Sequence, residues 1–152
     1  MKTKHIFVSA LDVGELLPFT VRKSKTLALD IKEQERARLE LVKFIDLLSR
    51  EYHEEIFYMG MDIIEAKTYE RFIFAKNGFF EIMTESPLAM SAHFVDKRNA
   101  DRFCAALKKT LAKLLKKDAM SQMFIDSIEV SEEEDESLTY QKWDRMKGIK
   151  GM

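Results

Sequence analysis

Apolar and polar residues alternate along several short segments of the chain, and this period of two predicts β-strands. The run at 57–65 alternates in this way and is expected to pair with 69–76. Further strands are expected at residues 6–11, 19–22, 90–94 and 123–130. Several short strands joined by short connections favour an antiparallel sheet.

The pair Asn77-Gly78 lies between two aromatic-rich runs and is the strongest short-range signal of a β-hairpin. A two-residue turn at this pair places Phe72 opposite Met83 and Phe74 opposite Glu81. One face of the hairpin then carries Ile73, Ala75, Phe80 and Ile82, and the other carries Phe72, Phe74, Phe79 and Met83. Both faces are apolar, which favours burial on both sides over one face being a binding surface.

A period of 3.6 residues replaces the alternation in the first predicted helix, which runs from Ile31 to about Glu55. Asp30 is its expected N-cap, with Glu33 as the reciprocal capping residue. The expected core stripe consists of Leu41, Ile45, Leu48 and Tyr52, widened by Val42, Phe44 and Leu47. The polar first turns are expected to project into solvent or to meet a partner.

A second helix is predicted from Lys97 to about Lys117, with Asp96 as its N-cap. Its expected core stripe consists of Ala100, Phe103, Cys104, Leu107, Leu111, Leu114 and Leu115. The two helices are candidate covers for the two faces of the hairpin. The hairpin is therefore expected at the centre of the core.

These elements predict an α+β fold: an antiparallel sheet of about five strands with a central β-hairpin, packed by two main helices. The chain has 152 residues, which suits one domain. We assign the domain to residues 1–130. Residues 131–152 are expected to form an acidic linker, with Glu132, Glu133, Glu134 and Asp135, and an aromatic and basic C-terminal tail.

Composition narrows the candidate chemistry. A net charge of −1 argues against a protein-wide field for nucleic acid or membrane. The single Cys104 cannot form an internal disulfide and three scattered histidines make no metal cluster, so no metal or other cofactor is expected. A lone cysteine fits a reducing, cytoplasmic setting. No stretch approaches the length of a transmembrane helix, so no membrane partner is expected.

One side of the second helix is basic and forms the candidate phosphate-binding site. It consists of Arg98, Arg102, Lys109, Lys113 and Lys116. Basic side chains on one helix face can neutralise phosphates and bind nucleic acid. A solvated face that keeps the helix soluble is the favoured alternative, because the net charge is not basic.

The C-terminal tail holds the candidate partner-binding residues. These are Tyr140, Trp143, Arg145 and Met146, beyond the acidic run. Trp, Tyr and Arg are enriched among interface hot spots, so the tail is a candidate anchor for a partner protein or for a second copy of the chain. The alternative is that the tail folds back on its own domain.

Two further hypotheses carry specific chemistry. Asp62, Glu65 and Lys67 resemble the carboxylate and lysine set of metal-dependent nucleases, but their spacing is wrong for that site. The aromatic face with Phe72, Phe74 and Phe79 is a candidate base-stacking platform, with core packing as the favoured alternative.

The absence of a catalytic motif favours a small intracellular, non-enzymatic protein-binding module, an adaptor or an inhibitor. An accessory protein of a phage or mobile element fits this profile, and homo-oligomerisation remains open. The alternative is a nucleic-acid-binding protein that uses the basic face of the second helix. A metal-dependent nuclease is the remote alternative.

Overall fold

The computed structural model describes residues 3–10, 17–19, 26–64, 67–74, 78–83 and 88–133. The strands in this part of the chain are β1 (Thr3–Ala10), β2 (Ile56–Ile64), β3 (Lys67–Phe74), β4 (Phe79–Met83), β5 (Leu88–Phe94) and β6 (Val130–Glu133). The helices are α1 (Leu27–Tyr52), α2 (Lys97–Leu114) and α3 (Ala119–Asp126). The strands form one antiparallel sheet in the order β2-β3-β4-β5-β1-β6. This confirms the predicted α+β class.

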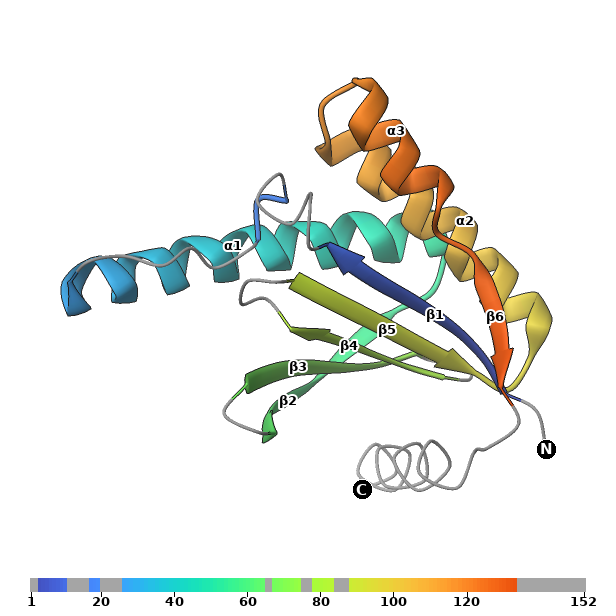
Figure 1. Cartoon of the computed structure of the whole chain (residues 1–152). Helices are drawn as coiled ribbons and strands as arrows, with labels where there is room; N and C mark the ends of the chain where they lie inside the picture. Colours follow the sequence, from blue (N-terminus) through green and yellow to red (C-terminus); the bar gives the residue numbers. More distant parts are fainter. Residues whose placement is uncertain are drawn as a thin grey trace.

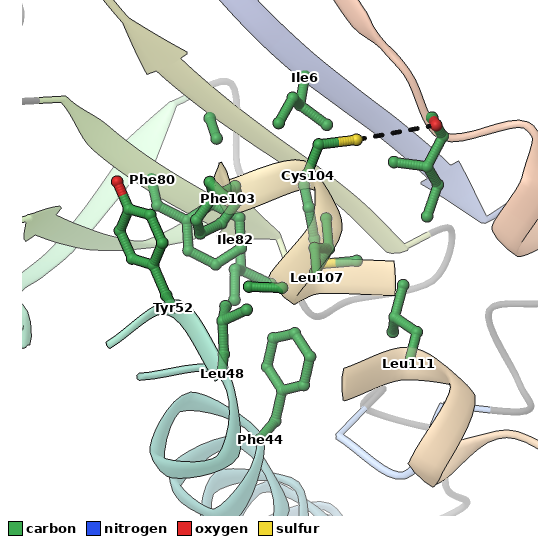
Figure 2. Close-up of a cluster of buried hydrophobic side chains, with 14 of the residues drawn as sticks. Ile6, Phe44, Leu48, Tyr52, Phe80, Ile82, Phe103, Cys104, Leu107 and Leu111 are labelled. Atoms are coloured by element: carbon green, nitrogen blue, oxygen red, sulfur yellow. Dashed lines mark hydrogen bonds between the residues drawn. The ribbon is translucent and has the colours of Figure 1, made fainter. Parts of the chain in front are cut away.

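The three helices lie on one side of the sheet (Figure 1) and share one hydrophobic core with it. Phe103 of α2 is surrounded by aromatic rings of both layers. Its ring centroid lies 5.0 Å from Phe74, 5.3 Å from Phe80, and 5.4 Å from both Phe94 and Tyr52. Figure 2 shows Phe103 beside Phe80, with Tyr52 of α1 close by. These ring contacts join α1 and α2 to the helix-facing side of the sheet.

The predicted hairpin exists, but its predicted register is wrong. Phe72 lies opposite Phe80 and Ile73 opposite Phe79, whereas a two-residue turn would place Phe72 opposite Met83. The backbone N–H of Phe74 donates to the carbonyl of Gly78 at 3.2 Å, so residues 75–77 lie between the two paired ends. Asn-Gly also occurs in longer hairpin loops, and the dipeptide alone does not fix loop length.

The change of register also corrects the predicted faces, because an odd shift moves one strand's side chains to the opposite face. Phe72, Phe74, Phe80 and Ile82 all point into the core beneath the helices. Ile73 and Phe79 instead form a small cluster with Met59 on the other side of the sheet, which we call the second face. The first and second helices, α1 and α2, cover the same face of the sheet. This corrects the prediction that they cover opposite faces of the hairpin.

All five residues of β4 are buried, which confirms burial of this strand on both sides.

The second helix begins as predicted: Asp96 caps it, and the Asp96 side chain accepts a hydrogen bond from the backbone N–H of Arg98 at 2.9 Å. β2 and β3 pair as predicted, and β5 covers the expected run at 90–94.

The first helix differs from its prediction at both ends. It begins at Leu27, so Asp30 lies within the helix and is not the N-cap. An acidic residue suits both the N-cap and the first turn, and Leu27 and Ala28 are strong helix formers that extend the helix backwards. The helix ends at Tyr52, and His53 has a left-handed φ of 58°, a conformation that terminates helices.

Residues 123–130 do not form the predicted last strand. The first half of this segment, residues 123–126, belongs to α3, which is capped by Asp118: the Asp118 carboxylate accepts a hydrogen bond from the backbone N–H of Ser121 at 2.8 Å. A short apolar run is ambiguous between helix and strand when periodicity is the only guide. β6 begins at Val130 and extends the sheet to Glu133, so the first residues of the acidic run belong to an edge strand.

The segment predicted as a strand at 19–22 is described only at Phe19, which lies in a turn. Phe19 is fully buried, and its ring centroid is 4.5 Å from that of Phe44 in α1. Arg36 of α1 donates to the carbonyl of Pro18 at 2.5 Å. Residues 17–19 are thus held against the helix side of the molecule.

We predict that Gly78→Ala destabilises the protein by about 3 kcal/mol or more. Gly78 has a φ of +114°, and an added Cβ would lie 2.5 Å from the carbonyl oxygen of His93. Gly60→Ala is the matched control, because Gly60 has a φ of +105° but no atom within 4 Å of its Cβ position. The control should lose only about 1–2 kcal/mol from backbone strain. Equal losses in urea unfolding would contradict the close approach of β5 to Gly78.

Candidate protein-binding surface

β2 is an edge strand of the sheet: within the described residues, it pairs with β3 on one side and with no strand on the other. An unpaired edge presents backbone N–H and C=O groups that can pair with another chain. Proteins commonly protect such edges with charges, proline or bulges. β2 has one charged residue, Asp62, and one bulge, where the register shifts between Tyr58 and Gly60.

Apolar side chains are unusually exposed along this edge and on the adjacent side of α1. Val42 of α1 is 59% exposed, and Tyr58, Met61 and Ile63 of β2 are 46%, 62% and 70% exposed. Tyr58 shares the helix-facing side of the sheet with Phe72, its cross-strand partner. Together these four residues define what we call the α1/β2 surface. The sequence placed Val42 in the core stripe, and its exposure corrects that expectation.

Two residues of this surface, Val42 and Tyr58, line a pocket of about 270 Å³. Its walls come from one side of α1 and from β2 and β3, through Arg38, Leu41, Val42, Ile45, Ile56, Tyr58 and Phe72. Five of these residues are aliphatic or phenylalanine, so the pocket is mostly apolar. Its polar groups, Arg38 and Tyr58, come from opposite sides, one from the helix and one from the strand.

A buried carboxylate joins these two polar groups. Glu70 of β3 is 6% exposed; it accepts a hydrogen bond from Arg38 at 2.7 Å and another from the Tyr58 hydroxyl at 2.5 Å. The Arg38 guanidinium also lies over the Tyr58 ring, 4.9 Å from its centroid. Partial burial and the Glu70 hydrogen bond raise the pKa of Tyr58 above its ordinary value. Tyr58 and Glu70 likewise raise the pKa of Arg38. The network anchors α1 to the edge of the sheet.

The basic face of α2 is only partly available to a ligand. Arg102 donates to the backbone carbonyl of Tyr52 at 2.9 Å and lies over its ring, so it holds α2 to the end of α1. Lys113 forms an ion pair with Glu51 of α1, which lowers the pKa of Glu51. Arg98, Lys109 and Lys116 are exposed. Two of the five candidate phosphate-binding residues therefore have intramolecular partners.

Three candidate sites from the sequence remain: the nuclease-like carboxylate and lysine set, the base-stacking face and the C-terminal tail. Asp62 forms an ion pair with Arg71 at 2.9 Å, while Glu65 lies outside the described residues. In the part of the chain that the structure describes, no group of three or more His, Cys, Asp or Glu could hold a metal ion. Phe72, Phe74 and Phe79 are all buried, which confirms the favoured alternative of core packing. Phe79 lies on the opposite face from the other two, so the three rings do not form the candidate base-stacking face. The tail candidates Tyr140, Trp143, Arg145 and Met146 lie outside the described residues.

Sequence reasoning missed the α1/β2 surface because alternation does not reveal strand order. The alternating pattern of the run at 57–65 is the same whether the strand is central or at an edge of the sheet. One signal was present: adding Val42 to the first helix made its apolar stripe wider than one buried face needs. An apolar residue beyond the edge of a core stripe is a candidate contact residue.

Comparison with protein-family models, with curated proteins and with solved structures finds no match for this chain. Among the described residues, no helix has the length and apolar character that crossing a bilayer requires.

We predict that Arg38 and Glu70 are energetically coupled by about 1 kcal/mol in a double-mutant cycle of Arg38→Met and Glu70→Gln. The physical reason is that one partner is buried, so solvent screens the pair weakly. The control is the Arg50–Asp46 pair of the same helix, 2.9 Å apart and largely exposed. Its coupling should not exceed about 0.5 kcal/mol. Equal coupling energies from urea unfolding would contradict a special role for Glu70.

We also predict that Cys104 reacts slowly with iodoacetamide in the folded protein. Burial raises the pKa of its thiol, which lies 3.8 Å from the carbonyl of Ile128 (Figure 2). The alkylation rate at pH 8 should be at least about 10-fold lower than in urea, because less thiolate forms and access is restricted. Equal rates with and without urea would show that the α2 stripe is open at Cys104.

Proposed function

We propose that this protein is a non-enzymatic protein-binding module, and that its α1/β2 surface receives an extended apolar segment of a partner protein. One observation carries the proposal. Val42 and Tyr58, 59% and 46% exposed, line one pocket, and Met61 and Ile63, 62% and 70% exposed, follow Tyr58 along the same unpaired edge strand. Apolar surface gathered in this way is typical of protein interaction sites.

An extended segment fits this surface because β2 can pair with it through its backbone. In strand addition, main-chain hydrogen bonds supply affinity and pockets for alternate side chains supply specificity. Met61 and Ile63 follow the bulge at Gly60, so the second half of β2 is the part best placed for pairing. The apolar pocket between α1 and β2 would then take one side chain of the added strand.

The size of the pocket favours a side chain over a small-molecule ligand. Sites for drug-sized ligands commonly measure about 300–1,000 Å³ and enclose most of the ligand. The pocket between α1 and β2, at about 270 Å³, lies below that range and opens onto an apolar surface. Arg38 and Tyr58 already satisfy Glu70, so the polar network serves to hold the walls in place.

The basic face of α2 supports nucleic-acid binding less well. Arg102 and Lys113 bridge α2 to α1, and removing them for phosphate contacts would break those links. The whole chain carries a net charge of −1, so little long-range attraction to nucleic acid is expected.

The proposal predicts that Val42→Glu combined with Ile63→Glu reduces partner binding at least about 100-fold, because each charge must be desolvated in an apolar interface. The probe is a displayed library of random peptides, selected on the immobilised wild-type protein and then measured against each variant. Enriched peptides should carry apolar residues at alternate positions.

Met123→Glu is the matched control, since Met123 is 73% exposed but lies on α3. It should bind the selected peptides as the wild type does. Peptides that bind the double variant undiminished, or no enrichment at all, would contradict the proposal. Salt-sensitive binding of oligonucleotides, lost in Lys109→Glu plus Lys116→Glu, would favour the basic face instead.

A further inference from the structure

The second face of the sheet is buried at its centre, although the helices lie on the other side. Phe79 is 1% exposed, Ile73 2%, Glu81 5% and Met83 6%. Phe79 stacks on His93, with ring centroids 4.6 Å apart, and Met59 packs beside it. These neighbours lie in the same sheet and flank the ring. A phenylalanine on an open sheet face would keep its outer surface in water, so another layer must cover it.

No described element supplies that layer. Residues of all three helices belong to the main core with Phe74 and Phe80, on the opposite face. Residues 11–16 and 20–25 flank Leu17 and Phe19, which are also part of the main core. The stretches 65–66, 75–77 and 84–87 are short connections between consecutive strands. Residues 134–152 are the remaining stretch with enough length to form a layer.

The position and length of this segment suit the second face. It follows Glu133 at the end of β6, one edge of the sheet, while β2 is the other edge. The two edges of a six-stranded sheet are about 24 Å apart. Nineteen residues follow Glu133, and they would span about 28 Å even if they were helical.

The composition of the segment also suits this face. Apolar residues recur at every third position in Tyr140, Trp143, Met146 and Ile149. Between them stand basic residues, including Lys142, Arg145 and Lys147. The second face offers an apolar centre together with two carboxylates, Asp62 and Glu81, that share one arginine, Arg71, at 2.9 and 3.8 Å. This pattern complements the apolar and basic stretch from Tyr140 to Lys150, which follows the acidic residues Glu134, Asp135 and Glu136 at the start of the segment.

We propose that residues 134–152 pack across the second face of the sheet of the same chain and cover Ile73 and Phe79. This interaction is independent of the partner site at the α1/β2 surface. It gives the aromatic tail an internal role, as the second layer of the core, and leaves the edge of β2 as the surface for a partner.

Adjacent residues of β2 provide a matched test by photo-crosslinking in the full-length protein. Phe57 is opposite Ile73 on the second face, whereas Tyr58 is opposite Phe72 on the helix side. They are 38% and 46% exposed, which leaves room for benzoylphenylalanine. Replacement of Tyr58 also removes its hydrogen bond to Glu70, so a probe at Met61, opposite Glu70 on the helix side and 62% exposed, serves as a second control that should not crosslink to the tail. On irradiation of the monomer, the probe at position 57 should form an intramolecular crosslink to a peptide within 134–152, located by mass spectrometry. The probe at position 58 should not.

Three results would overturn the proposal: equal crosslinking to the tail from both positions, no crosslink from position 57 to the tail, or a crosslinked dimer in which position 57 joins the tail of another copy. A second measurement uses Trp143, the only tryptophan of the chain. Its fluorescence should be protected from acrylamide in the folded protein, and Trp143→Ala should lower the urea midpoint while Trp143→Phe largely restores it. An unchanged midpoint in Trp143→Ala would also contradict the packed tail.

Discussion

The pairing of Ile73 with Phe79 is the constraint on which the arrangement of the molecule depends. Side chains alternate along a strand, so this one pairing assigns Phe72, Phe74, Phe80 and Ile82 together to the helix side. Phe103 can then contact Phe74 and Phe80 at once. Gly78 makes the pairing sterically possible, because its missing side chain leaves room for the carbonyl of His93. A shift by an odd number of residues would place Phe79 beneath α2 and remove Phe80 from it.

Much of the fold follows from local patterns that the sequence displays. Asp96 and the apolar stripe of α2 predict that helix well, because capping and periodicity act over a few residues. Two predictions were wrong: the element type of residues 123–130 and the register of the hairpin. These two errors have the same cause. The run at 123–130 is too short for its period to be decisive, and the Asn77-Gly78 pair is compatible with more than one loop length. In the folded chain both segments make contacts with residues distant in the sequence: Phe80 contacts Phe103, and Ile125 of α3 belongs to the main core.

The candidate site was harder to predict than the fold. The exposure of Met61 and Ile63 depends on the position of β2 at the edge of the sheet, and strand order is a property of the whole chain. The link between Arg38 and Glu70 joins residues that no local pattern relates. Two members of the predicted basic face of α2, Arg102 and Lys113, hold α2 against α1. A charged helix face can therefore serve packing between helices as well as solubility.

These features divide the sheet into surfaces with different roles. The helix side is closed by the ring contacts around Phe103. The second face is buried at Phe79, and its proposed cover is residues 134–152 of the same chain. The edge of β2 stays apolar and unpaired within the described residues, and α1 contributes Val42 to the same surface. Of these surfaces, the edge is the one best suited to bind another protein.

The most direct measurement is an NMR experiment on aromatic rings in the full-length protein. Nuclear Overhauser effects should connect the ring of Phe103 with that of Phe80, and the ring of Phe79 with that of His93, at centroid distances of 5.3 and 4.6 Å. Such contacts require the observed register of β3 and β4. Contacts between Phe103 and Phe79, with none to Phe80, would contradict it, together with the division into a helix side and a second face that follows from it.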